Sequence, residues 1–504
     1  MTKTIKKILV LTLLATTLTA CGSGQTAETR MIKQVTDGVE AQSAEIRLRN
    51  VKIVKDELSQ GILIGTLINW SDQADAITGI SIGGVSATLS APKFDLLKNK
   101  PIIFVGDSAN ADAFGRTRVS NPLTLFDSSH RYRDNNLWDS LVVGTASTIG
   151  FATTAGLVNM TVGVGSTASV IRETTKVFSY QPGKSLLTMN TFVLNPPKEN
   201  LRQRVGYFGA DNGIYFEVDG TTAYFVERSL SLGTETRVSQ SNWNIDKLDG
   251  TGISGITLDI TKAQILWMDI EWLGLGTVRI GFVINGQFVH CHSFHHANLI
   301  ESTYITTASL PLRYEIANTG ITTSVSTLKQ VCSTVISEGG YELRGLQQAV
   351  STPITAPVDL PSPAGTYYPV LSIRLKTSPD RLDAIVILTA LSLMGTGNGP
   401  QYNWQMRASA TTSGGTWASA GVDSAVEYKI DGGTVSGGRI LASGFFSSNN
   451  QSQASVDILK EALFKFQLER NGLTGSPYEL TLVCATDTSG ADVFASLDWE
   501  EISR

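Results

Sequence analysis

The sequence predicts an all-β protein built from several domains. Two long stretches, residues 203–226 and 264–294, support this fold class. Each alternates apolar and polar residues with a period of two and is interrupted by turn residues, which is typical of antiparallel strands. The chain has 504 residues, more than one ordinary hydrophobic core accommodates, so we expect two or three domains.

The stretch from Gln264 to Phe294 predicts three consecutive strands. Turns are expected at Gly274–Gly276 and at Asn285-Gly286, because Asn-Gly tolerates the positive φ angles of a type I′ hairpin turn. We expect one face of this meander in the core and the other open to a ligand or a partner. Residues 203–226 predict a second meander, with turns at Asn212-Gly213 and Asp219-Gly220.

Composition excludes several classes of protein. Hydrophobic residues make up 42% of the chain, which argues against disorder. The formal charge of −5 is spread without long runs, so no nucleic-acid partner is expected. The four cysteines lie far apart and form no C-x-x-C pair. We therefore expect buried free thiols at Cys291 and Cys484 instead of a disulfide framework.

The N-terminus has the layout of a secretory signal. Residues 1–21 begin with lysines and continue through a short apolar run to Leu18-Thr19-Ala20-Cys21, which resembles a bacterial lipobox with Cys21 as the acylated residue. The apolar run is too short to span a bilayer by itself. An amphiphilic segment buried inside an assembly is the alternative interpretation. Residues 22–60 are polar and predict a tether or stalk.

Turn residues and prolines divide the remainder of the chain. Residues 61–109 predict a small N-terminal β module for anchoring, and residues 110–350 predict a two-sheet sandwich or jelly roll. Residues 351–366 hold four of the 15 prolines and predict a stiff linker. Residues 367–504 predict a second, smaller β-sandwich.

The strongest candidate for chemistry is the segment Trp267-Met268-Asp269-Ile270-Glu271. Asp269 and Glu271 are two residues apart on a strand, so both side chains point to one face, with about 6–7 Å between Cα atoms. Paired carboxylates at such a spacing suit a retaining glycosidase.

This segment resembles the E-x-D-x-E active-site strand of laminarinase- and lichenase-type glycoside hydrolases, which are concanavalin-like jelly rolls. The resemblance implies a helper Asp269 and an acid/base Glu271, but Trp267 stands where the family has its nucleophile. Without a nucleophile the covalent intermediate does not form by that route. A degenerate sugar-binding face made of Trp267, Asp269 and Glu271 and an ordinary sandwich strand remain as alternatives, and no catalytic residue is expected.

Four of the five histidines lie within seven residues, at His290, His292, His295 and His296. His290 and His292 share a face of the predicted strand and would present two imidazoles to a metal. The neighbouring Cys291 points the opposite way, and no carboxylate has ligand-like spacing. A solvated strand end is favoured, and neither a metal nor a cofactor is expected.

Seven long and distinctive segments lie in the second part of the chain and near its end. They are ANADAFGRTRVSNPLTLFDSSHRYRDN, SYQPGKSLLTMNTFV, RQRVGYFGADNGIYFE, WNIDKLDGTGISGITLDITKAQILWMDIEWLG, LPLRYEIANTG, FKFQLERNGLTGSPYELTL and DVFASLDWEEI. Together they resemble a family of virion structural proteins of tailed bacteriophages. The resemblance covers approximately residues 100–504 and implies a tail fibre, capsid-surface fibre or adhesion protein. It also implies a homo-oligomer, expected to be a trimer, that contacts other virion proteins and host-surface glycans. Residues 1–99 fall outside it and would dock to the particle.

Location separates this hypothesis from its alternatives. Virion proteins assemble in the cytoplasm and need no export signal, so a working lipobox would instead indicate a surface lipoprotein, anchored in the outer membrane at Cys21 and carrying a carbohydrate-binding sandwich. A glycan hydrolase with a degenerate active-site strand is the third hypothesis. The sequence favours the first, a non-enzymatic virion component.

Overall fold

The computed structural model describes residues 39–43, 45–55, 61–73, 75–82, 85–86, 94–98, 102–104 and 122–503, the last range with gaps at 343, 362, 398, 431–432, 449–453 and 458–465. Strands dominate this part of the chain, and its only helical element is a 3₁₀ turn, η1 (Gln240–Asn242). No helix in these ranges is long and apolar enough to cross a membrane. The chain forms two compact units, Met1–Asp107 and Ser108–Arg504.

The N-terminal unit contains a four-stranded sheet of order β1-β2-β3-β8. The predicted tether differs from the structure here, because β1 and β2 lie within residues 22–60, pair with each other, and join the sheet where β2 pairs with β3. The predicted signal segment and Cys21 lie outside the described residues. The strands of this unit are β1 (Val39–Ser43), β2 (Ile46–Lys55), β3 (Gly61–Asn69), β4 (Asp75–Ile77), β5 (Ser81–Ile82), β6 (Val85–Ser86), β7 (Phe94–Leu96) and β8 (Ile102–Phe104).

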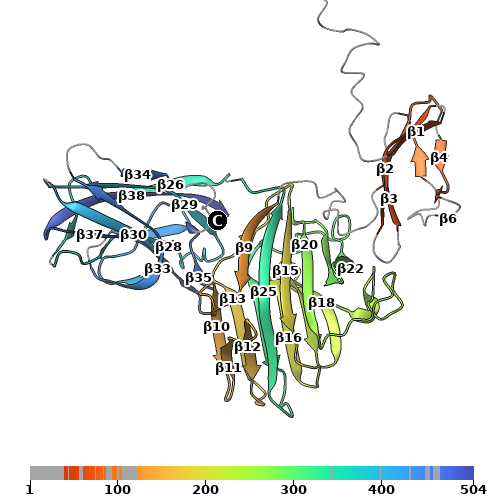
Figure 1. The fold of residues 1–504 in the computed structure, drawn as a ribbon, viewed down its shortest axis with the longest axis horizontal. Coiled ribbons are helices and arrows are strands. Elements are labelled where there is room, and N and C mark those ends of the chain that lie inside the picture. The colour runs from red at the N-terminus through yellow and green to blue at the C-terminus, as the bar shows by residue number, and fades with distance from the viewer. Residues whose placement is uncertain are drawn as a thin grey trace, which may run out of the picture. The chain divides into compact units, whose positions relative to one another are not determined.

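The second unit begins with a jelly-roll sandwich, which we call the central sandwich (Figure 1). One layer is a seven-stranded antiparallel sheet of order β10-β13-β24-β16-β17-β18-β19. Its strands are β10 (Trp138–Val143), β13 (Ser169–Thr174), β16 (Leu201–Phe208), β17 (Gly213–Asp219), β18 (Thr222–Ser229), β19 (Thr234–Ser239) and β24 (Leu312–Asn318).

The other layer is an eight-stranded sheet of order β11-β12-β25-β15-β20-β21-β22, with β9 also paired to β25. A short pair, β14 (Phe178–Ser179) with β23 (Ser309–Leu310), lies outside both layers. The strands of the layer are β9 (Leu123–Ser129), β11 (Thr148–Ala152), β12 (Leu157–Val162), β15 (Ser185–Val193), β20 (Ala263–Ile270), β21 (Val278–Ile284), β22 (Gln287–Phe294) and β25 (Ser326–Glu338).

Both predicted meanders are confirmed. Residues 203–226 fall in β16, β17 and β18, and residues 264–294 in β20, β21 and β22. Asn285 and Gly286 have φ angles of 51° and 77°, as the predicted type I′ turn requires.

The apolar faces of the two layers meet in one core. Phe216 of the seven-stranded sheet lies edge-on against Phe282 of the eight-stranded sheet, with 5.2 Å between ring centroids. Phe225 stacks on Trp243 at 4.1 Å. Such aromatic contacts between sheets fix their spacing and exclude water from the sandwich interior.

Residues 346–503 form the C-terminal sandwich, which confirms the predicted second, smaller β-sandwich. Its layers are a five-stranded sheet, β26-β38-β29-β34 with β27 paired to β38, and a six-stranded sheet, β31-β32-β28-β37-β30-β33. The pair β35 (Arg470–Asn471) and β36 (Ser476–Pro477) lies outside them. The layer strands are β26 (Leu346–Ser351), β27 (Val358–Leu360), β28 (Tyr368–Leu375), β29 (Ile385–Gly395), β30 (Gln401–Thr412), β31 (Ala418–Ser419), β32 (Val426–Ile430), β33 (Val435–Ser447), β34 (Ala454–Asp457), β37 (Glu479–Thr486) and β38 (Ala491–Ser503).

The proline-rich segment differs from the predicted linker. Within residues 351–366, Val358–Leu360 forms β27 and pairs with the last strand of the chain. Leu360 is fully buried in the C-terminal core. This segment is therefore built into the second sandwich, since prolines are tolerated around a short edge strand.

Polar and apolar contacts join the two sandwiches. Arg470 donates to the Glu173 carboxylate at 2.6 Å, and its backbone N–H donates to the carbonyl of Thr175 at 2.8 Å. The Gln467 amide donates to the carbonyl of Val177 at 2.9 Å. The Val177 side chain packs with Ile385, Ile387 and Ile502 of the C-terminal sandwich. The joint between the sandwiches is thus buried and hydrogen-bonded.

Candidate functional site

The structure buries all three residues of the predicted sugar-binding face. Trp267 is 1% exposed, and Asp269 and Glu271 are 0% exposed. The Trp267 ring packs against Phe288 and His290, with centroids 5.6 and 5.8 Å away. The expectation of an open face is therefore wrong for these residues, because neighbouring side chains cover the strand on this side as well.

The two carboxylates also interact with other parts of the protein. Asp269 lies opposite Arg279 across β20 and β21, with 3.6 Å between carboxylate oxygen and guanidinium nitrogen. Glu271 accepts a hydrogen bond from the Tyr180 hydroxyl at 3.1 Å, and its carbonyl accepts one from Tyr304 at 3.2 Å. Both carboxylates are thus contacted by the protein's own side chains on a covered face of the strand.

The histidines that were expected to share a strand face point to opposite faces. The pairing register of β21 and β22 shifts between His290 and His292, so Cys291 is the extra residue of a β-bulge. His290 lies against Trp267 on the side away from the core. His292 lies against Phe225 in the core, with 6.4 Å between centroids. The bulge separates the two imidazoles that a metal would have required.

The buried His292 predicts a pH dependence of stability. Burial, followed by repulsion from His290 and His295, lowers the pKa of His292 from 6.5 to about 4. Between pH 4 and pH 6.5 the unfolded chain binds a proton at His292 that the folded chain does not bind. The contribution of His292 to the free energy of unfolding is therefore fully present above pH 6.5 and is lost as the pH drops toward 4. We expect a loss of about 1–3 kcal/mol, measured by urea unfolding at pH 7 and pH 4.5.

A His292→Gln variant is the control for this effect. It removes the titrating group while keeping a side-chain acceptor for the backbone N–H of Asn244, which donates to His292 Nδ1 at 3.2 Å. The variant's stability is expected to fall less steeply over the same pH interval. If the free energy of unfolding falls equally steeply with pH in both proteins, groups other than His292 cause the acid sensitivity.

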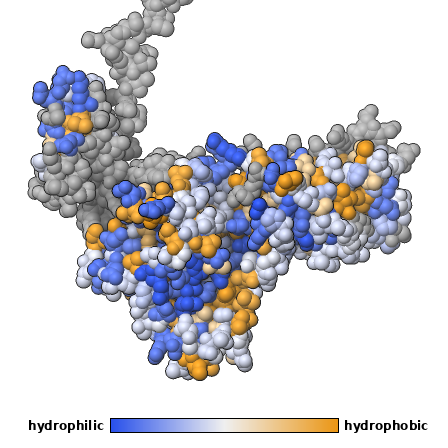
Figure 2. Space-filling view, turned by 180° about the vertical axis from the view of Figure 1, so that it is seen from behind, coloured by the Kyte–Doolittle hydropathy of each residue, from blue (hydrophilic) through white to orange (hydrophobic). Residues whose placement is uncertain are grey.

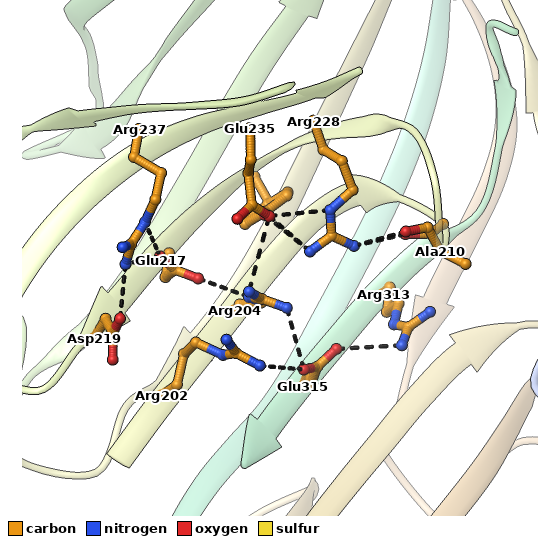
Figure 3. Close-up of polar contacts among 12 residues, drawn as sticks. Arg202, Arg204, Ala210, Glu217, Asp219, Arg228, Glu235, Arg237, Arg313 and Glu315 are labelled. Carbon is orange, nitrogen blue, oxygen red and sulfur yellow. Dashed lines mark hydrogen bonds and ion pairs between the residues drawn. The ribbon is translucent and has the colours of Figure 1, made fainter. Parts of the chain in front are cut away.

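The outward face of the seven-stranded sheet carries a continuous ladder of ion pairs, which we call the Arg–Glu ladder (Figure 3). Neighbouring strands contribute alternating charges, because the antiparallel register places Glu217 opposite Arg204, and Arg204 opposite Glu315. Its members are Arg202, Arg204, Glu217, Asp219, Arg228, Glu235, Arg237, Arg313 and Glu315.

The middle of the ladder is buried and its rim is partly exposed. Arg204 donates to Glu217 at 2.7 Å, and these side chains are 7% and 1% exposed. Arg237, with 33% of its side chain exposed, donates to Asp219 at 2.8 Å. Burial opposes the charge of Glu235, but hydrogen bonds from Tyr215 and Arg228 outweigh it and lower the pKa of Glu235. Glu235 thus stays charged at neutral pH.

Aromatic rings lie beneath these guanidinium groups. Arg237 lies 4.3 Å from the ring centroid of Tyr224, and Arg228 lies 5.3 Å from that of Tyr215. Figure 2 shows strongly hydrophilic residues gathered over the middle of the central sandwich. The guanidinium groups and carboxylates at the rim offer the hydrogen-bond donors and acceptors that pair with sugar hydroxyls.

Sequence reasoning missed this face. The signal was present as charges at i and i+2, such as Arg202 and Arg204, or Glu217 and Asp219, inside the predicted meander. The partner Glu315 comes from β24, 111 residues after Arg204. The ladder could therefore be recognised only with the pairing of these strands in hand.

No protein-family model and no curated protein match this chain. Solved structures of low identity do match it. The carbohydrate recognition domain of Emp47p has 8% identity and a TM-score of 0.28, covering 43% of this chain and 97% of that domain. Peanut lectin has 8% identity and a TM-score of 0.27, covering 43% and 98%.

A third similar structure is a Bacteroides ovatus mixed-linkage glucan GH16 protein in complex with a product. It has 10% identity and a TM-score of 0.29, covering 42% of this chain and 99% of that one. Similarity at this level carries no argument about function. The functional argument therefore rests on the residues of this chain.

Proposed function

We propose that this chain is a non-enzymatic structural component of a phage virion, of the tail- or capsid-fibre or adhesion type, and that its central sandwich contacts host-surface glycans through the Arg–Glu ladder. The resemblance of residues 100–504 to virion proteins supports the first part. We further propose that the chain assembles as a homotrimer and contacts other virion proteins through residues 1–99.

The observation that carries the glycan proposal is the rim of the ladder. Asp219, Arg237 and Glu235 have 32%, 33% and 35% of their side chains exposed, above a buried layer that holds them in place. Groups fixed in this way bind without a large loss of conformational entropy. The burial of Asp269 and Glu271 supports the non-enzymatic part, because neighbouring side chains cover the carboxylate pair that resembles a glycosidase site.

Purified particles test the virion proposal. We expect the chain in gradient-purified virions, detected by mass spectrometry in a constant ratio to the capsid protein. Its absence from particles would overturn the proposal. Native mass spectrometry of the isolated chain tests the trimer, and a monomeric mass would contradict that part alone.

Binding to extracted host-surface glycans tests the ladder. We expect Arg237→Ala to weaken binding about tenfold, since a charge-assisted hydrogen bond contributes on that order. The matched control is Arg344→Ala, which removes a guanidinium that is 78% exposed and lies outside the sheet. Equal binding by both variants would exclude the ladder as the contact surface.

A surface lipoprotein is the second candidate, favoured by the Leu18–Cys21 segment of the sequence. The intact mass of the native protein separates the two. A chain that retains residues 1–20 supports the virion proposal, whereas an acylated chain beginning at Cys21 supports a lipid-anchored protein of the outer membrane.

A further inference from the structure

A pocket of about 510 Å³ lies where the central sandwich meets the C-terminal sandwich. The central sandwich contributes Arg133, Trp138, Asp139 and Thr175 to its lining, and the C-terminal sandwich contributes Arg439 and Tyr478. This volume falls within the range of pockets that bind small molecules. The pocket is separate from the exposed rim of the Arg–Glu ladder.

Two buried oxygen atoms in this lining have no hydrogen-bond partner among the residues that the structure describes. They are Oδ2 of Asp139 and Oγ1 of Thr175, and Thr175 is only 4% exposed. The other oxygen of Asp139 accepts a hydrogen bond from the Tyr478 hydroxyl at 2.6 Å, which fixes the carboxyl group. Buried polar atoms are nearly always paired in folded proteins, so these two atoms mark a place where a ligand supplies the partner.

The charges around the pocket favour an anion. Arg133 is exposed and forms no ion pair with any residue in the described ranges. Arg439, by contrast, donates hydrogen bonds to the Glu469 carboxylate at 2.7 Å and to the carbonyl of Asn136 at 3.3 Å. Burial raises the pKa of Asp139, although the hydrogen bond from Tyr478 and the charge of Arg470 oppose this shift.

The wall contributed by the C-terminal sandwich is preformed. Ser409 has a φ of 57° at a register shift in β30, a conformation that side chains other than glycine rarely adopt. Opposite it, Gly438 has a φ of 85°, and a Cβ there would lie 2.9 Å from the Cβ of Ala410. Strained backbone of this kind gathers at binding sites, where the surrounding fold holds it in place.

We propose that this pocket binds a saccharide unit that carries a carboxylate, such as a uronic or sialic acid. Arg133 pairs with the ligand's carboxylate, and Asp139 and Thr175 form hydrogen bonds with its hydroxyl groups. The site goes beyond the proposed function, because it depends on the joint between the two sandwiches and not on the ladder or on a virion.

Titration of the full chain with free sugars tests this site. Glucuronate and N-acetylneuraminate are added as the acidic probes and glucose as the neutral control, with binding followed by saturation-transfer NMR and calorimetry. We expect at least one acidic sugar to bind with a dissociation constant at least tenfold below that of glucose. Binding of glucose with the same affinity as the acidic sugars would overturn the proposal. So would the absence of binding of every probe at concentrations up to about 20 mM, since specific recognition is rarely weaker than the millimolar range.

Three variants locate the binding. Arg133→Ala is expected to weaken binding of the acidic sugar about tenfold, whereas Arg131→Ala removes an exposed guanidinium two residues away, outside the pocket lining, and should leave affinity unchanged. Thr175→Val keeps the shape of the side chain but removes its hydroxyl, and we expect a loss of about threefold to tenfold. Equal effects of Arg131→Ala and Arg133→Ala would show non-specific charge attraction and overturn the assignment of the pocket.

Discussion

Replacing Glu217 with alanine is expected to lower the free energy of unfolding by about 3–5 kcal/mol. Glu217 is fully buried and accepts hydrogen bonds from Arg204 at 2.7 Å and from Arg237 at 2.9 Å. The variant leaves the Arg204 guanidinium, only 7% exposed, with a weaker contact to Glu315 at 3.4 Å. A buried charge that loses its partner is far more destabilising than the ion pair was stabilising.

Urea unfolding of the Glu217→Ala protein, followed by tryptophan fluorescence, measures this loss. The control is Glu235→Ala, since Glu235 belongs to the same ladder but has 35% of its side chain exposed. Its removal is expected to cost at most about 1 kcal/mol. If the two variants lose equal stability, the buried middle of the ladder has no special role.

Replacing Glu173 with alanine is expected to cost about 3–5 kcal/mol and to weaken the joint between the two sandwiches. Glu173, with 3% of its side chain exposed, accepts from Arg470 of the C-terminal sandwich at 2.6 Å and from Arg313 at 3.3 Å. Its loss removes the carboxylate partner of Arg470, whose side chain is 8% exposed, and leaves Arg313 paired with Glu315 at 3.2 Å. We therefore expect the C-terminal sandwich to become easier to cleave from the central one by protease.

A double-mutant cycle isolates this contact. Glu173→Ala, Arg470→Ala and the double variant are compared by calorimetry, and we expect a coupling energy of about 1–3 kcal/mol. The control is Glu427→Ala, which breaks a half-exposed pair with Arg374 inside one sandwich and should leave protease resistance at the joint unchanged. A coupling energy near zero would mean that the apolar contacts of Val177 and the other hydrogen bonds of the joint hold the sandwiches together without this ion pair.

The sequence alone was sufficient for the strands and turns of the two meanders. The alternation of apolar and polar residues in 203–226 and 264–294 predicts strands directly, because neighbouring side chains on a strand point to opposite faces. Asn285-Gly286 predicts its turn for an equally local reason, because both residues tolerate a positive φ angle. The presence of a second, smaller sandwich followed from the same patterns in residues 367–504.

The tertiary structure alone decided which faces are buried and which residues meet. Trp267, Asp269 and Glu271 lie on the strand face that their alternation predicted, yet that face is covered. One extra residue, Cys291, reverses the relation between His290 and His292. A single inserted residue changes every face beyond it, and periodicity in the sequence does not reveal where the insertion falls.

Distance along the chain explains the remaining differences. Val358–Leu360 resembles a linker because its partner strand, Ala491–Ser503, lies at the end of the chain. Glu173 and Arg470 are 297 residues apart, and Asp139 and Tyr478 are 339 residues apart. Local patterns fix the conformation of each strand, whereas the ladder and the pocket depend on pairings between distant segments, which are set by the packing of the whole unit.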